Sequence, residues 1–202
     1  MPTKDFLFDI GNVILKFDFS PAIQALADRS KAAHDDVLQP IESIKSQLES
    51  GQLDDQSFVS EAIRILDFQD SREEFIRIWC EIFELNPPMG ELIESLAANG
   101  HRLFILSNTS GLHMDYILAT YPVFSHFEDG VYSYDAKAEK PQPEIYQIAI
   151  DKFNLDPTNT IYIDDLHANV VAGVDVGLNT FHYDHADHDA LLAHLRAHDI
   201  EC

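Results

Sequence analysis

A short apolar run near the start of the chain, Phe6-Leu7-Phe8, ends at one carboxylate, Asp9, and the chain then turns at Gly11-Asn12. A run of this length bounded by turn-forming residues is typical of a buried strand in a parallel sheet. Asp9 then lies at the carboxyl end of that strand, and open α/β sheets bind their ligands at that edge. Taken alone, a carboxylate at this place can cap a turn, ligate a metal or act as a nucleophile.

The second half of the chain alternates strands with helices. We expect strands at about 101–106, 131–134, 160–163 and 180–183, and helices at about 91–99, 112–120, 143–153, 168–176 and 188–198. Pro143 in a first turn and Gly177 after a last turn are position-specific helix signals. This order predicts an α/β fold, a Rossmann-like parallel sheet core with helices on both faces.

The first half carries a helical insert. From residue 21 to about residue 85 the apolar positions repeat at helical spacing, with breaks near His34-Asp35-Asp36, Ser50-Gly51-Gln52 and Phe68-Gln69-Asp70-Ser71. We therefore expect a small α-helical cap after the first strand, with Trp79 and Phe83 packed in its core. The expected domains are an α/β core of residues 1–16 and 89–202 and a cap of residues 17–88.

The charge balance restricts the partners. The chain has 13 Lys and Arg against 35 Asp and Glu, a net charge of -22, which argues against binding to nucleic acid or to an anionic membrane. We expect neither a membrane span nor a signal peptide. Its two cysteines, Cys80 and Cys202, are far apart and suggest neither a metal-ligand pair nor a disulfide framework. A cytoplasmic location is the expectation.

Polar residues end three of the expected strands. These are Asp9, Ser107-Asn108 and Asp164-Asp165, and the parallel arrangement places them at one edge of the sheet. Lys140, held extended by Pro141, can reach the same edge. Clustered carboxylates coexist most easily around a hard cation such as Mg²⁺, and a hydroxyl, backbone amides and a lysine suit the oxygens of a phosphate. Individually, the same residues could cap a helix, form a strand-end turn or be a solvated lysine.

Four segments in order resemble the motifs of the haloacid dehalogenase-like (HAD) hydrolase superfamily. They are Phe8-Asp9-Ile10-Gly11-Asn12-Val13, Leu106-Ser107-Asn108-Thr109, Lys140-Pro141 and Ile163-Asp164-Asp165-Leu166-His167-Ala168-Asn169. The helical insert resembles the cap of that superfamily. The first and fourth segments, together with Glu49-Ser50-Gly51 and Phe58, resemble the branch that contains α-D-glucose-1-phosphate phosphatases.

This resemblance implies a metal site. Asp9 would be the nucleophile that forms an aspartyl-phosphate, and it would also bind Mg²⁺ together with the backbone carbonyl of Gly11. Asp165 would ligate the metal directly, and Asp164 would be a more distant or water-mediated partner.

The resemblance also implies a phosphate site and an activity. Ser107 and Asn108 would bind the phosphoryl group, and Lys140 would neutralise the nucleophile and the transferring oxygens. The expected activity is Mg²⁺-dependent hydrolysis of a small phosphorylated metabolite, such as glucose 1-phosphate, by a monomer or a homodimer. The cap is expected to close over the site and exclude water.

One position departs from the family pattern. Many phosphatases of the superfamily carry a second aspartate, a general acid, where this chain has Gly11. The loss of an acid matters least when the leaving group is good, as an anomeric hydroxyl is, which favours a sugar 1-phosphate. Asp18, His113 or a substrate group could supply the proton instead, although we expect Asp18 to be a loop or hinge residue and His113 and His167 to lie on helix surfaces or caps.

Two other functions remain open from the sequence. Dehalogenases of the superfamily also lack the second aspartate, so the chain could hydrolyse carbon–halogen bonds. The Asp164-Asp165 pair argues against this, because a metal-free dehalogenase has no need of clustered acidic ligands. A non-catalytic relative that binds phosphorylated ligands is the third possibility.

Overall fold

The structure is a computed structural model that describes residues 3–31 and 37–201. A five-stranded parallel sheet has the order β5-β4-β1-β6-β7. Its strands are β1 Asp5–Phe8, β4 Arg102–Ser107, β5 Asp129–Tyr132, β6 Thr160–Asp164 and β7 Asn179–His182. The central strand β1 pairs with β4 and β6, with Phe8 opposite Ile105 and Ile163. The strand ends at Phe8, and Asp9 follows at once, so Asp9 lies at the carboxyl edge of the sheet.

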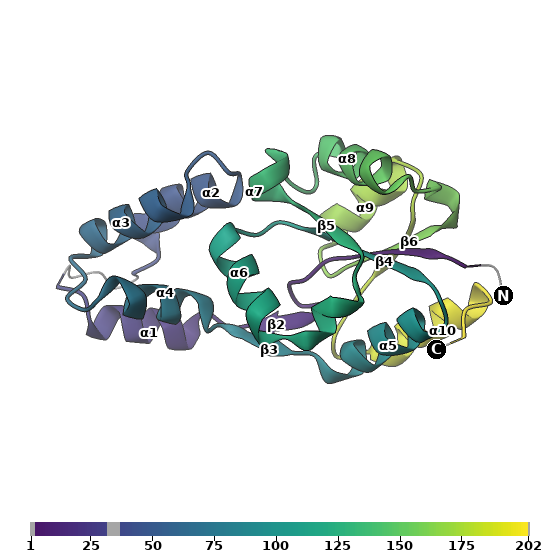
Figure 1. The fold of residues 1–202 in the computed structure, drawn as a ribbon, viewed down its shortest axis with the longest axis horizontal. Helices are drawn as coiled ribbons and strands as arrows, with labels where there is room; N and C mark the ends of the chain where they lie inside the picture. Colours follow the sequence, from purple (N-terminus) through teal and green to yellow (C-terminus); the bar gives the residue numbers. More distant parts are fainter. Residues whose placement is uncertain (1–2, 32–36, 202) are drawn as a thin grey trace.

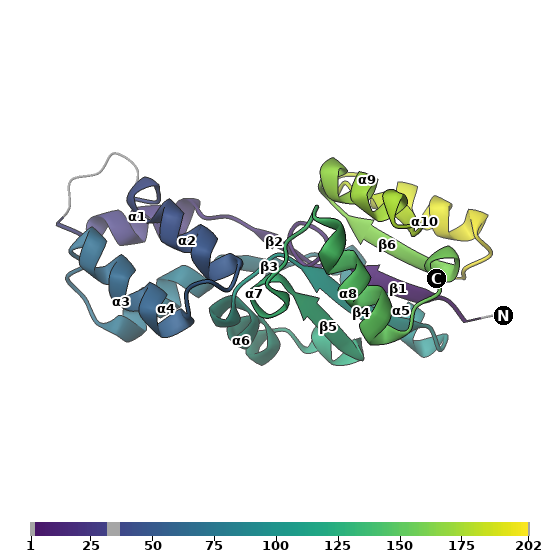
Figure 2. The same cartoon turned by 90° about the horizontal axis from the view of Figure 1, so that it is seen from above.

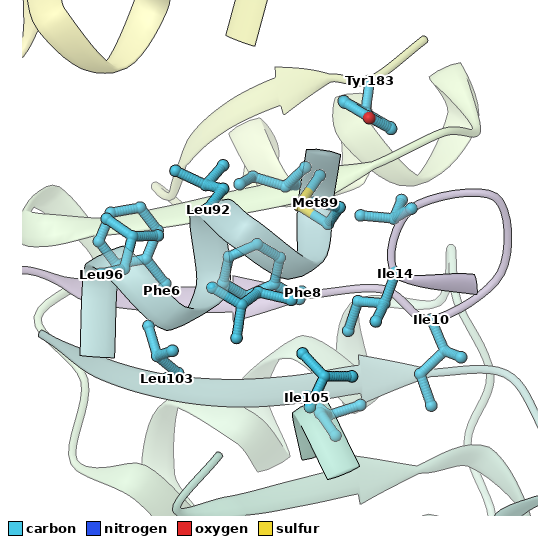
Figure 3. Packing of buried hydrophobic residues seen from close by; sticks show 14 of the residues in the cluster. Phe6, Phe8, Ile10, Ile14, Met89, Leu92, Leu96, Leu103, Ile105 and Tyr183 are labelled. Carbon is cyan, nitrogen blue, oxygen red and sulfur yellow. The ribbon is translucent and has the colours of Figure 1, made fainter. Parts of the chain in front are cut away.

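Helices cover both faces of this sheet (Figure 1). On one face lie α5 (Pro87–Ala98), α6 (Gly111–Thr120) and α10 (His188–Ala197), and on the other lie α8 (Pro143–Phe153) and α9 (His167–Asp175). Alternate side chains of β1 divide between the two faces: Phe6 and Phe8 join one buried cluster and Leu7 the other. Figure 3 shows Phe6 and Phe8 packed with residues of α5 and β4.

A separate group of helices lies beyond the carboxyl edge of the sheet (Figure 2). It contains α1 (Ser20–Asp28), α2 (Glu42–Glu49), α3 (Asp55–Leu66) and α4 (Arg72–Cys80), with a 3₁₀ turn at Gln39–Ile41. These helices surround a hydrophobic cluster of their own that includes Phe58, Phe75 and Trp79. Trp79 thus packs in a core as predicted. The α/β fold, the parallel sheet covered on both faces and the helical insert after the first strand are confirmed.

Two local predictions were wrong. The stretch taken as helical up to residue 85 ends in a strand, β3 (Phe83–Leu85), which pairs antiparallel with β2 (Leu15–Phe17). Each strand has three residues, too few to show alternation, and each depends on a partner nearly 70 positions away. The strand expected at 131–134 ends at Tyr132, because Ser133–Ala136 forms a short helix, α7.

The β2–β3 pair joins the insert to the sheet. We predict that the cap spans residues 17–88 and that residues 1–16 and 89–202 form the core, and these boundaries stay a prediction. The break expected at His34-Asp35-Asp36 and the residue Cys202 lie outside the described residues. Within the described ranges, no helix has the length and apolar character needed to cross a membrane.

Candidate active site

Asp9 is held in one orientation at the tip of the central strand. Its backbone N–H donates to the carbonyl of Ile163 on β6 at 3.0 Å. Three groups bond its Oδ1 atom: the backbone N–H of Ile10 at 2.7 Å, the Ser107 hydroxyl at 2.8 Å and the Lys140 ammonium at 2.8 Å. Among the described residues, all hydrogen-bond partners of this carboxylate meet Oδ1. The other oxygen of Asp9 is therefore the one that can meet a ligand.

Lys140 lies between two carboxylates. Its ammonium is 2.8 Å from Asp9 Oδ1 and 2.7 Å from Asp164 Oδ2, and its side chain is only 1% exposed. Burial works against the charged lysine, but the two carboxylates outweigh it and raise its pKa. Lys140 thus stays cationic and neutralises part of the negative charge at the sheet edge.

Asp164 is fully buried and bonded by its surroundings. Its Oδ1 accepts from the backbone N–H of Leu166 at 2.8 Å, and Asn169 donates to both carboxylate oxygens at 3.0 and 3.1 Å. The Tyr162 hydroxyl also donates to Oδ2. Such a network fixes the position of Asp164 and, through it, that of Lys140.

Asp165 points to the same place and is more open to solvent. Asn12, in the left-handed region at φ 52°, donates its amide to Asp165 Oδ2 at 3.1 Å. Oxygen atoms of Asp9, Asp164 and Asp165 all lie within 4.8 Å of one another. The structure therefore brings together the three carboxylates that the sequence placed at the ends of two different strands.

The cluster holds more negative charge than Lys140 balances. The pKa of Asp9 is raised to about 6, mainly by burial. Lys140 lowers this pKa and the nearby charge of Asp164 raises it. Burial also raises the pKa of Asp165. Three carboxylate oxygen donors with an unbalanced charge form a set that suits a hard divalent cation.

Ser107 and Asn108 both reach the cluster, but in different ways. The Ser107 hydroxyl lies on Asp9, as described above. The side chain of Asn108 accepts from the backbone N–H of Lys140 at 2.8 Å and donates to the carbonyl of Lys140 at 2.9 Å. The Asn108 amide thus holds the loop that carries Lys140.

Several site residues were not predicted. Asn12, Tyr162 and Asn169 orient the acidic groups, as described above. Ser133 at the start of α7 is fully buried; its hydroxyl accepts from the Thr109 backbone N–H at 3.0 Å and donates to the Glu49 carbonyl of the helical insert at 2.6 Å. The sequence held signals for two of these residues: Asn12 follows a glycine in a turn, and Asn169 belongs to the fourth motif. Ser133 carries no such signal, because its partners are remote in sequence.

Ser133→Ala should destabilise the protein by about 1–3 kcal/mol, because the buried Thr109 N–H loses its acceptor. Urea unfolding would measure this change. The control is Ser125→Ala, which removes an exposed hydroxyl that bonds the Pro122 carbonyl at 2.7 Å. Equal midpoints for the two variants would show that the Ser133 bridge adds nothing to stability.

The two candidate proton donors of the chain, His113 and Asp18, lie outside this cluster, as does His167. His113 is buried, unlike the helix-surface or capping position we predicted: its ring stacks on Trp79 and its Nε2 donates to the Trp79 carbonyl at 3.1 Å. Burial lowers the pKa of His113 to about 4, so its ring is neutral at pH 7. Asp18 is exposed and accepts from the Ser20 N–H at the start of α1, as expected of a loop residue. His167 is the exposed first residue of α9, also as expected.

A pocket of about 140 Å³ opens beside the cluster, between the sheet edge and the helical insert. Ser107, Asn108 and Gly11 line one part of it, and Lys45 and Glu49 of α2 line another. Phe17 also lines the pocket and lies directly over Gly11: a Cβ atom built on Gly11 would be 3.1 Å from Cε1 of Phe17. A side chain at position 11 would therefore need the Phe17 ring to shift by a few tenths of an ångström.

The chain is similar to known proteins over most of its length. A family model described as haloacid dehalogenase-like hydrolase matches residues 3–177. D-ribitol-5-phosphate phosphatase from Bacteroides thetaiotaomicron is 29% identical over 189 residues, which is 88% of this chain and 90% of that protein. 6-Phosphogluconate phosphatase from Escherichia coli is 25% identical over 124 residues, 61% of this chain and 55% of that protein. A HAD family enzyme from Bacteroides thetaiotaomicron, solved as a magnesium complex, superposes with a TM-score of 0.80 at 22% identity and covers 90% of this chain and 93% of that one.

Proposed function

The chain belongs to the haloacid dehalogenase-like hydrolase family, and we propose that it is a Mg²⁺-dependent phosphatase of small phosphorylated sugars or polyols. The observation that carries this proposal is the convergence of Asp9, Asp164 and Asp165 around Lys140. The relatives described above, phosphatases of a polyol phosphate and of a sugar-acid phosphate, support the substrate class.

Asp9 is the proposed nucleophile. One of its oxygens is fixed by three donors, which supports the other as the attacking atom: it would bond to phosphorus as the bond to the ester oxygen breaks, releasing the alcohol and forming an aspartyl-phosphate. Water then attacks that phosphorus, releasing inorganic phosphate and restoring the Asp9 carboxylate.

The metal would be held by Asp9, the Gly11 carbonyl and Asp165, with Asp164 as a water-mediated partner. The donor chemistry supports this assignment, since all these groups offer oxygen and the acidic cluster carries excess negative charge. When bound, Mg²⁺ would balance charge on the phosphoryl oxygens.

Ser107 and Lys140 are the proposed phosphoryl-binding side chains. Both side chains bond Asp9 Oδ1. A phosphoryl group held at Asp9 would lie next to this atom, so Ser107 and Lys140 could donate hydrogen bonds to the phosphoryl oxygens instead. Asn108 is proposed to bind the phosphoryl group through its backbone N–H, since its side chain holds Lys140.

We further propose a preference for a good leaving group, such as the anomeric oxygen of a hexose 1-phosphate. Position 11 offers no acid, and the described candidates to replace one are a neutral buried His113 and an exposed Asp18 bonded to Ser20. The departing oxygen must then leave with little help from a proton, which favours an acidic alcohol.

The test is phosphate release, with and without Mg²⁺, over a panel that includes α-glucose 1-phosphate, glucose 6-phosphate and ribitol 5-phosphate. We expect release that requires Mg²⁺ and is fastest for the 1-phosphate. Faster release from ribitol 5-phosphate would keep the phosphatase and remove the leaving-group argument. Absence of release, with chloride release from a haloacid without Mg²⁺, would identify a dehalogenase; ligand binding without any hydrolysis would identify a non-catalytic relative.

A further inference from the structure

The pocket beside the acidic cluster has a charged wall that the chemistry at phosphorus does not use. Lys45 and Glu49 lie one turn apart on α2, and their charged groups are 3.5 Å apart. Both line the pocket whose other part is formed by Ser107, Asn108 and Gly11. A leaving group attached to a phosphoryl group at the sheet edge would therefore extend toward this pair.

The wall is half-buried and has an acidic excess. The side chains of Lys45 and Glu49 are 21% and 30% exposed, and burial raises the pKa of Glu49 while Lys45 opposes the rise. Lys45 also pairs with Glu42 at 3.7 Å, and the charge of Glu139 acts on Glu49 as well. One lysine is thus shared among several carboxylates, and a further negative charge here would be poorly balanced.

The pair is also fixed in place relative to the sheet. The backbone carbonyl of Glu49 accepts from the buried Ser133 hydroxyl at 2.6 Å, and the Gly51 carbonyl accepts from the Lys137 ammonium at 2.5 Å. These bonds tie the end of α2 to α7, next to the Ser107-Asn108-Thr109 loop. The distance between the phosphoryl site and the charged wall is therefore set by the fold.

We propose that Lys45 and Glu49 select the leaving group, favouring uncharged polyhydroxyl groups over groups with a carboxylate; this rests on the phosphatase function proposed above. A hydroxyl can donate to the Glu49 carboxylate and accept from the Lys45 ammonium, and such charge-assisted bonds are strong. A carboxylate can only accept, and it meets the repulsion of Glu49. The two residues thus discriminate by attraction and by repulsion together.

The experiment compares two substrates that differ only at the far end, sorbitol 6-phosphate with a CH₂OH group and 6-phosphogluconate with a carboxylate. The readout is the ratio of kcat/KM for the polyol to that for the acid, measured with Mg²⁺. For the unmodified protein we expect a ratio of about ten or more, which corresponds to one charge repulsion across the pocket. Glu49→Gln should lower the ratio severalfold, and Lys45→Met should raise it, because the two variants change the wall charge in opposite directions.

Glu73→Gln is the matched control. It removes a carboxylate from the first turn of α4 in the same helical insert, but Glu73 is exposed and does not line the pocket, so the ratio should stay as in the unmodified protein. A ratio that is unchanged in both Glu49→Gln and Lys45→Met would overturn the assignment while leaving the phosphatase in place. Absence of phosphate release from every ester would overturn the proposed function itself. If Glu49→Gln fails to fold, a ratio that does not rise in Lys45→Met overturns the assignment.

Discussion

Asp9→Asn should lower kcat for phosphate release by at least about a thousandfold, because an amide cannot replace the carboxylate as the attacking group. The amide has nearly the same shape and can still accept from Ser107 and Lys140, so the fold should persist. Phosphate release under saturating Mg²⁺ measures the loss. Asp175→Asn is the control, an exposed aspartate at the last residue of α9, and it should keep full activity. Substantial turnover by Asp9→Asn would remove Asp9 from the role of nucleophile.

The same variant should be more stable than the unmodified protein when Mg²⁺ is absent. The pKa of Asp9 is raised from 3.8 to about 6 in the folded protein, chiefly by burial, so its charge opposes folding above that pH. The gain for Asp9→Asn should therefore be present at pH 7–8, at roughly 1–3 kcal/mol, and should disappear as the pH falls from 6 to below 4, where Asp9 is protonated in both states. Urea unfolding in EDTA across this range measures it. If Asp9→Asn is instead less stable than the unmodified protein at pH 8, the attraction between the Asp9 carboxylate and Lys140 stabilises the fold by more than the burial of that charge destabilises it.

The sequence was most informative where chemistry and local pattern coincide. Asp9, Ser107 and Asp164-Asp165 each stand at the end of a strand, so their meeting follows from the parallel sheet. Lys140 stands before a proline in a loop, which Asn108 holds against the same edge. Helices with clear start signals could also be predicted from the sequence. The expected bounds 143–153 agree with α8, because a proline starts this helix and its apolar positions repeat regularly.

What the sequence could not supply are contacts made only by tertiary folding. The β2–β3 pair is defined by its partner strand, and Ser133 by a loop and a cap helix from elsewhere in the chain. His113 is polar and sits on a helix, yet Trp79 and Phe83 enclose it from another part of the chain. The motif suggests that the Asn108 side chain binds a ligand, but in the structure that side chain is hydrogen-bonded to the backbone N–H and carbonyl of Lys140.

Gly11→Asp should raise kcat/KM for an alkyl phosphate such as glycerol 3-phosphate by about a hundredfold, the lower part of the range for general acid catalysis. The new carboxyl would stand two residues after the nucleophile, where it can protonate a poor leaving group. The backbone of Gly11 is not in the left-handed region, so a side chain brings no backbone strain. The new Cβ would be 3.1 Å from Cε1 of Phe17, and that ring, 43% exposed, can turn outward.

The gain should depend on the leaving group and on Phe17. For α-glucose 1-phosphate, whose anomeric oxygen leaves more easily, we expect a much smaller rise, so the preference for the 1-phosphate should shrink. Gly11→Ala presents the same Cβ without an acid and should give no rise for either substrate. If Phe17 hinders the new side chain, the double variant Gly11→Asp with Phe17→Ala should exceed Gly11→Asp alone. Equal losses in Gly11→Asp and Gly11→Ala for both substrates would mean that this position needs its glycine for space, and the leaving-group argument would no longer follow from the missing acid.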